Sequence, residues 1–182
     1  MLNNVMVDLE TLGTTADAAI ISIGAVRFDL ESDEIDDNGF YASISIESNA
    51  VFKRTISEDT LKWWMQQSKE AQVVFTEPKV SLYAALVDFS DWIKSFETAD
   101  VFMWSNGADF DLPMLIHAYD QAIVEPPWKF YNNRCFRTYK NLPGAKNIRG
   151  GKPGIKHNAL ADAIYQARTL QVIHQTLFKK AP

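Results

Sequence analysis

Cysteine is nearly absent from this chain of 182 residues, which contains only Cys135. A single cysteine excludes an intramolecular disulfide and a multi-cysteine zinc site, and it fits a reducing compartment. The sequence also lacks an apolar run long enough to span a bilayer. The start is not that of a signal peptide, because Asp8 and Glu10 interrupt the first apolar segment. We therefore expect a cytoplasmic protein that has no membrane partner.

Glycine and proline are also scarce, with 8 and 7 residues, which argues against disordered or collagen-like chains. Hydrophobic residues make up 47% of the chain and include five tryptophans, enough for a sizeable core. Together with the length, this composition predicts a single domain over residues 1–182.

The net charge of −5 at first argues against a nucleic-acid partner, but the charges are segregated. Residues 29–37 carry acidic side chains and no basic ones. Residues 126–161 carry no acidic side chain, so one face of the protein has a positive field whatever the total charge. A solvated basic loop is the alternative interpretation. The basic residues of this segment are Lys129, Arg134, Arg137, Lys140, Lys146, Arg149, Lys152 and Lys156.

The first apolar segment, residues 5–11, predicts a buried β-strand that carries two acidic side chains. Alternate side chains of a strand project to the same side, so Asp8 and Glu10 are expected to point together. Two like charges at the end of a buried strand repel each other and lose hydration, and a bound cation is the usual reason for such a pair. A strand end that opens onto a solvated turn at residues 11–13 remains the alternative.

The apolar periodicity predicts an α/β fold. Residues 18–28 and 40–46 are expected to be strands joined by the acidic loop, so that the first three strands form an antiparallel meander. Helices are expected from Ser57, with Leu61, Trp64 and Met65 on one face, and over about 80–96, 111–122 and the residues after 158. Residues 101–104 predict a short strand, and residues 125–156 are irregular. These elements predict a mixed sheet flanked by helices.

Two further acidic positions lie where an element begins. Asp109 and Asp111 follow the short strand, and Phe110 between them is expected to face the core, so only one of the two acids should point into a site. Asp111 could instead cap its helix. Asp162 lies early in the last helix, and His157 lies at or just before its start. His117 and His174 are expected to be ordinary helix residues.

Three segments together resemble the motifs of the DEDDh exonucleases: Asp8-Leu9-Glu10-Thr11, Asn106-x-x-x-Phe110-Asp111 and His157-x-x-x-x-Asp162. This family, the DnaQ-like 3′→5′ exonucleases, has a ribonuclease-H-like fold, in which three antiparallel strands are followed by parallel strands. The resemblance covers nearly the whole chain. It is greatest to compact stand-alone bacterial and phage enzymes of the ribonuclease-T and oligoribonuclease type. Cys135, between Arg134 and Arg137, departs from that subgroup, where an acid is expected.

The resemblance implies two-metal-ion hydrolysis, which releases nucleoside monophosphates from the 3′ ends of single-stranded DNA or RNA. It implies that four carboxylates hold two Mg²⁺ or Mn²⁺ ions, with Asp8 reaching both, and that His157 is the general base. It further implies a possible homodimer. The expected metal ligands are Asp8, Glu10, Asp111 and Asp162, and the expected substrate contacts are Thr11, Leu12, Trp64, Asn106, Phe110 and Arg137. Whether Trp63 or Trp64 contacts the substrate stays open.

Other functions explain less of the sequence. A non-catalytic nucleic-acid-binding module would have no need of the complete set of acids and the histidine. A metal-independent glycoside hydrolase needs only two carboxylates of different pKa. An interaction protein explains none of the motifs. The choice between DNA and RNA stays open, because reading a 2′-hydroxyl depends on one or two polar groups whose positions the sequence does not show.

Overall fold

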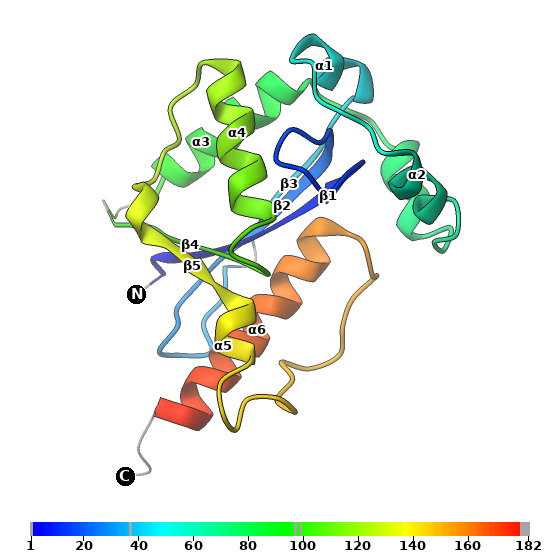
Figure 1. Cartoon of the computed structure of the whole chain (residues 1–182). Helices are drawn as coiled ribbons and strands as arrows, with labels where there is room; N and C mark the ends of the chain where they lie inside the picture. The colour runs from blue at the N-terminus through cyan, green and yellow to red at the C-terminus, as the bar shows by residue number, and fades with distance from the viewer. Residues whose placement is uncertain (1, 37, 97, 99, 179–182) are drawn as a thin grey trace.

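The first strand, β1 (Asn4–Thr11), is the central strand of a five-stranded sheet (Figure 1). The computed structural model describes residues 2–36, 38–96, 98 and 100–178. The strand order is β3-β2-β1-β4-β5. The pairs β1–β2 and β2–β3 are antiparallel, whereas β1–β4 and β4–β5 are parallel. The predicted mixed sheet is thus confirmed. The other strands are β2 (Ile20–Phe28), β3 (Phe40–Ser43), β4 (Phe102–Ser105) and β5 (Asn133–Cys135).

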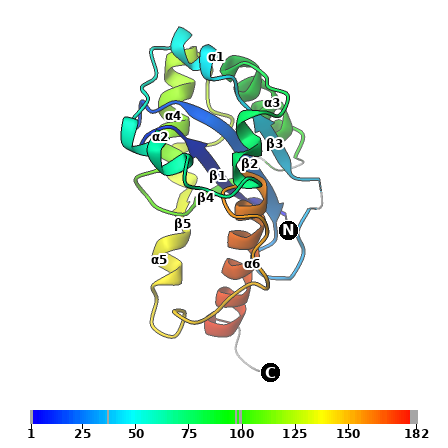
Figure 2. The ribbon, with the colours of Figure 1, turned by 90° about the vertical axis from the view of Figure 1, so that its right-hand side faces the viewer.

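Helices cover both faces of this sheet. In Figures 1 and 2, α3 and α4 lie on one side, and α5 and α6 lie on the other. Among the described residues, no helix combines the length and apolar character needed to cross a membrane. The α-helices are α1 (Ile46–Val51), α2 (Glu58–Trp64), α3 (Leu82–Lys94), α4 (Asp111–Ala122), α5 (Phe136–Lys140) and α6 (Ala159–Phe178), and the 3₁₀ helices are η1 (Ala71–Phe75) and η2 (Phe130–Asn132).

The alternation of side chains along β1 decides what lies on each face. Val5 and Val7 belong to the core that includes Phe89 of α3 and Leu115 of α4. Met6 belongs to the opposite core, which includes buried residues of α6. Asp8 and Glu10 have the parity of Met6, so they project toward the α6 side of the sheet.

Helix α6 approaches the sheet very closely beside the acidic end of β1. Gly24 of β2 pairs with Asp8, and a Cβ atom at Gly24 would lie 2.1 Å from backbone atoms of Ala159 and Leu160. Such a distance is far inside van der Waals contact, so only glycine permits this approach. The first turn of α6 is therefore held next to Asp8.

Several expected elements differ in their boundaries. Ser57 caps α2, its Oγ accepting a hydrogen bond from the Thr60 amide, as predicted. The prediction for Met65 was wrong, because the helix ends at Trp64 and Met65 is 77% exposed. The third strand stops at Ser43, and α1 follows where strand was expected.

The segment expected to be irregular, residues 125–156, contains three short elements: η2, β5 and α5. None exceeds five residues, which is too short to show a hydrophobic period. The Cys135 Sγ accepts a hydrogen bond from the Thr138 amide and so caps α5. The single cysteine thus has a structural role at this helix start.

Candidate active site

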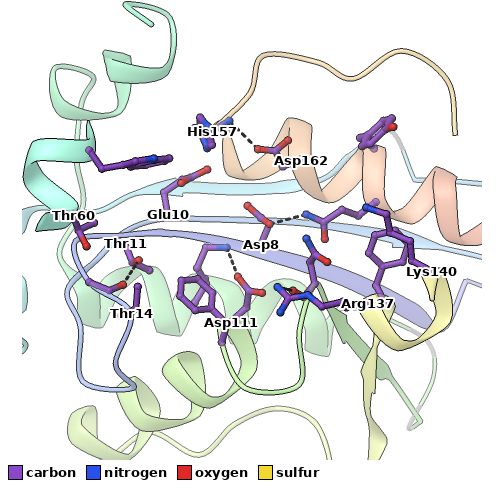
Figure 3. Close-up of a pocket in the computed structure, with 18 of the residues that line it drawn as sticks. Asp8, Glu10, Thr11, Thr14, Thr60, Asp111, Arg137, Lys140, His157 and Asp162 are labelled. Atoms are coloured by element: carbon purple, nitrogen blue, oxygen red, sulfur yellow. Dashed lines mark hydrogen bonds between the residues drawn. The ribbon is translucent and has the colours of Figure 1, made fainter. Parts of the chain in front are cut away.

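The four acidic residues and His157 line one cavity of about 710 Å³, which opens at the end of β1 (Figure 3). Asp8 and Glu10 come from β1, Asp111 from the start of α4, and Asp162 from the first turn of α6. Residues more than 150 positions apart in the sequence are therefore brought to one place. The site depends on β1 being the central strand, because α4 and α6 reach it from opposite faces.

Asp111 faces the cavity and does not cap its helix. It is 3% exposed, and its Oδ1 accepts a hydrogen bond from the Leu9 amide at 3.1 Å. The N-cap position is Phe110, where no side-chain cap is formed. Asp109, the other acid of this junction, is exposed and is not among the residues that line the cavity. The bond to Leu9 ties Asp111 directly to the strand that carries Asp8 and Glu10.

His157 lies in the loop before α6 and has a left-handed backbone, with φ of 60°. Its amide donates a hydrogen bond to Asp162 Oδ2 at 2.9 Å. One ligand atom from each of Glu10, His157 and Asp162 lies within 4.8 Å of the other two. A left-handed non-glycine residue is uncommon and strained, so the local contacts must stabilise this conformation.

Burial and mutual repulsion make these acids unusual. Burial, followed by the charges of Asp111 and Glu10, raises the pKa of Asp8 well above its ordinary value. Burial, with the charges of Asp162 and Asp111, raises the pKa of Glu10 to about 8. Carboxyl groups this far from their ordinary pKa are common at functional sites.

The two remaining acids are shifted in the same direction. Burial raises the pKa of Asp111 to about 6, against the lowering effect of the Leu9 amide and of Arg137. Burial also raises the pKa of Asp162, opposed by the hydrogen bond from the His157 amide. All four pKa values are thus raised, which means that ionising these groups in the metal-free site is costly.

The donor set fits a hard divalent cation. Four carboxylates and one imidazole offer mainly oxygen ligands, which suit Mg²⁺ and Mn²⁺. Added positive charge between the acids would offset the repulsion that raises their pKa values. The single cysteine of the chain, Cys135, is not among the residues that line the cavity, so the site has no thiolate ligand.

Of the two adjacent tryptophans, Trp63 reaches the cavity, whereas Trp64 was named as the expected substrate contact. Trp64 is 2% exposed, and its Nε1 donates a hydrogen bond to the Thr11 carbonyl oxygen. Trp63 is 41% exposed and lines the cavity. Adjacent helical residues face different directions, so the bond to Thr11 commits Trp64 to the interior and leaves Trp63 outside.

The structure does not support the expected substrate contact of Leu12. Its side chain is fully buried in a small core with Ile21 and Trp64 beneath α2, so it does not reach the cavity. The other expected contacts, Thr11, Asn106, Phe110 and Arg137, do line it. Phe110 is partly buried against the core and still borders the cavity, which reconciles the two roles considered for it.

One residue that the sequence analysis did not identify is Gln166, which lines the cavity and donates a hydrogen bond from Nε2 to Asp8 Oδ1 at 2.7 Å. It follows Asp162 by four positions on α6, and side chains at this spacing share a helix face. This four-residue spacing is the feature of the sequence that could have identified Gln166. Among the basic residues, Arg137, Lys140 and Arg149 line the cavity.

Known proteins resemble this chain in sequence and in fold. The family model for the 3′-5′ exoribonuclease Rv2179c-like domain matches residues 3–174. The exodeoxyribonuclease of Enterobacteria phage T4 is 27% identical over 158 residues, covering 73% of this chain and 68% of the phage protein.

The solved structures include the nuclease domain of 3′hExo, a DEDDh family member bound to rAMP, with a TM-score of 0.64, 14% identity, and coverage of 98% of this chain and 94% of that one. Cell-death related nuclease 4 has a TM-score of 0.65 and 14% identity. The match covers 96% of this chain but only 64% of that nuclease. At such identities, the structural similarity shows the ribonuclease-H-like fold. Since the family model spans nearly the whole chain, this protein belongs to the family of the 3′-5′ exoribonuclease Rv2179c-like domain.

Proposed function

We propose that this exonuclease removes nucleoside monophosphates from the 3′ end of single-stranded nucleic acid by two-metal-ion hydrolysis. The observation that carries the proposal is the meeting of four acids and His157 around one cavity. Asp8, Glu10, Asp111 and Asp162 would hold two Mg²⁺ or Mn²⁺ ions, with Asp8 shared between them. When bound, such ions supply electrophilic activation and neutralise charge on the phosphate.

His157 is the proposed general base. Its ring lies beside Glu10 and Asp162 at the cavity wall, where it can accept a proton from the attacking water. Histidine suits this task because a neutral imidazole has a ring nitrogen that can accept a proton. The hydrogen bond from the His157 amide to Asp162 links the position of the base to that of a metal ligand. We expect the rate to rise through neutral pH toward mildly alkaline conditions.

Basic residues line the same cavity beside the acids. Arg137 and Lys140 project from α5 toward the cavity (Figure 3), and Arg149 follows in the next loop. None of the three has a carboxylate salt-bridge partner within the part of the chain that is described. Phosphates of the strand upstream of the 3′ end would supply the missing negative charges.

Trp63 is the proposed stacking surface for a base. Its partial exposure at the cavity leaves part of the indole ring available, and base–aromatic stacking works with unpaired strands of any sequence. The family description favours RNA, whereas the phage relative is an exodeoxyribonuclease. The test of the proposal therefore uses both RNA and DNA as substrates.

The test gives the purified protein matched single-stranded RNA and DNA, labelled at the 5′ end, with Mg²⁺, Mn²⁺ or EDTA. A ladder that shortens from the 3′ end, depends on metal and releases monophosphates is expected. Asp8→Ala should be close to inactive, and His157→Ala should lose most of its turnover. Internal cuts, or activity that survives EDTA, would overturn the proposal, and binding without cleavage would indicate a non-catalytic module.

A further inference from the structure

Gln166 is a buried amide in contact with the central acid of the site. It lies one turn after Asp162 on α6 and is 7% exposed. Its Nε2 donates a hydrogen bond to Asp8 Oδ1 at 2.7 Å. Its Oε1 is buried and has no hydrogen-bond partner among the described residues. The side chain thus uses one end of its amide on Asp8 and leaves the other end unsatisfied.

This arrangement is costly for the fold alone. A buried polar atom without a partner destabilises a protein, because it gives up its hydrogen bonds to water on folding and gains none in return. Ala163, Ala167 and Leu170, which are buried on the same helix, are apolar and pack against the sheet. The buried polar residues Thr169 and Gln171 of α6 both have hydrogen-bond partners. A methionine at position 166 would fill similar space without an unsatisfied oxygen. The glutamine therefore requires an explanation beyond packing.

We infer that Gln166 is a positioning residue, whose amide holds the Asp8 carboxylate in the orientation that binds the metal ions. The inference rests on the proposed function, because it concerns the same site. A donor fixed on Oδ1 restricts rotation of the carboxylate and directs its remaining lone pairs into the cavity. Gln166 also lines the cavity, although its Oε1 is itself buried.

The test measures the dissociation constant of Mn²⁺ by calorimetry on the purified chain without substrate. Gln166→Met keeps the length of the side chain but has no N–H, and we expect it to weaken Mn²⁺ binding about tenfold or more. The Mn²⁺ concentration for half-maximal rate should rise, while the rate at saturating Mn²⁺ stays close to that of the wild type. Gln166→Ala, which leaves room for water, should show the same shift and replaces the first variant if that one does not fold.

Gln171 provides the matched control. It is a second buried glutamine on α6, 2% exposed, and its Nε2 donates to the carbonyl oxygens of Asp29, Ser32 and Glu34, away from the cavity. Gln171→Met should lower the melting temperature and leave the Mn²⁺ dissociation constant unchanged.

Two results separate the inference from the proposed function. Wild-type Mn²⁺ affinity in both Gln166 variants, together with lost affinity in Asp8→Asn, would overturn the role of Gln166 alone. Wild-type affinity in Asp8→Asn as well would overturn the metal site itself, and the inference with it.

Discussion

Trp63 and His157 are in direct contact, with ring centroids 4.8 Å apart and ring planes at 83°. This edge-to-face contact joins α2 to the loop before α6, two segments that are distant in the sequence. It places an indole against one side of the proposed general base. On the other side, the backbone of His157 is bonded to Asp162.

We therefore predict that Trp63→Ala lowers kcat about tenfold, because the imidazole loses the surface that orients it. Trp63→Phe keeps an aromatic contact and should retain most of the activity. The exposed neighbour Met65 provides the control, and Met65→Ala should behave as wild type. Steady-state kinetics on a labelled oligonucleotide would check this. An unchanged kcat with only a higher KM in Trp63→Ala would mean that the indole binds substrate without orienting the base.

The metal-free protein should lose stability as the pH rises. The folded state raises the pKa of Glu10 to about 8 and that of Asp111 to about 6. Between about pH 5 and pH 8, the folded protein therefore holds more protons than the unfolded chain, and the free energy of unfolding decreases with pH. The raised pKa values of Asp8 and Asp162 act in the same direction. Thermal melts in EDTA across this range would measure the slope.

Added Mn²⁺ and the Asp8→Asn variant provide the controls for these thermal melts. Saturating Mn²⁺ should raise the melting temperature more at pH 8 than at pH 6, because ligands must be deprotonated to bind. Asp8→Asn removes one of the repelling charges and should flatten the slope in EDTA. A melting temperature that rises between pH 6 and pH 8 in the metal-free wild type would contradict the assignment of these acids as a mutually repelling cluster.

Arg137 should contribute to phosphate binding. It lines the cavity, and its Nη2 donates to the Asn106 carbonyl oxygen at 2.6 Å. Arg137→Ala should weaken the binding of single strands and reduce the slope of log K against log salt by about 0.7. Arg134 is the matched control, since its guanidinium lies over the Phe102 ring, outside the cavity. Equal effects of Arg134→Ala and Arg137→Ala in a salt titration would reject a specific contact at Arg137.

Gly24→Ala should destabilise the fold strongly, because the added methyl group would meet the backbone of α6 at 2.1 Å. Overpacking of this kind costs about 1–3 kcal/mol, and activity should fall further, since α6 carries Asp162. Gly151→Ala offers a comparison, because that glycine has a φ of +109° but open space around its Cβ position. Denaturant unfolding of both variants would separate a steric clash from backbone strain. A Gly24→Ala variant as stable as the wild type would refute the close approach of helix and sheet.

Much of the fold was predictable because its signals are local. The apolar runs and the acidic loop between them indicated the antiparallel meander, and the pair Asp8 and Glu10 marked the end of the central strand. The motifs around Asp111 and His157 could be read from their resemblance to those of the DEDDh exonucleases. Each of these features depends on a few neighbouring residues, so one sequence is enough to show it.

The errors concern side chains whose direction is decided by distant contacts. Trp63 and Trp64 have the same side chain, and the hydrogen bond from Trp64 to Thr11, together with its packing in the core beneath α2, decides which one is buried. Leu12 follows a motif residue directly, yet its side chain packs beneath α2. The role proposed for Gln166 depends on its hydrogen bond to Asp8, which is 158 positions away in the sequence. Such partners belong to tertiary structure, and no periodicity reveals them.

The hydrogen bond between Gln166 and Asp8 also means that a fragment of the chain that lacks either β1 or α6 cannot form the site. One strand from the first residues and one helix from the last residues must both be in place before the acids meet, so the unfolded polypeptide has no catalytic activity of its own. Loss of nuclease activity in denaturant should therefore coincide with the unfolding of the sheet. The reaction itself can then serve as a reporter of global folding in this protein.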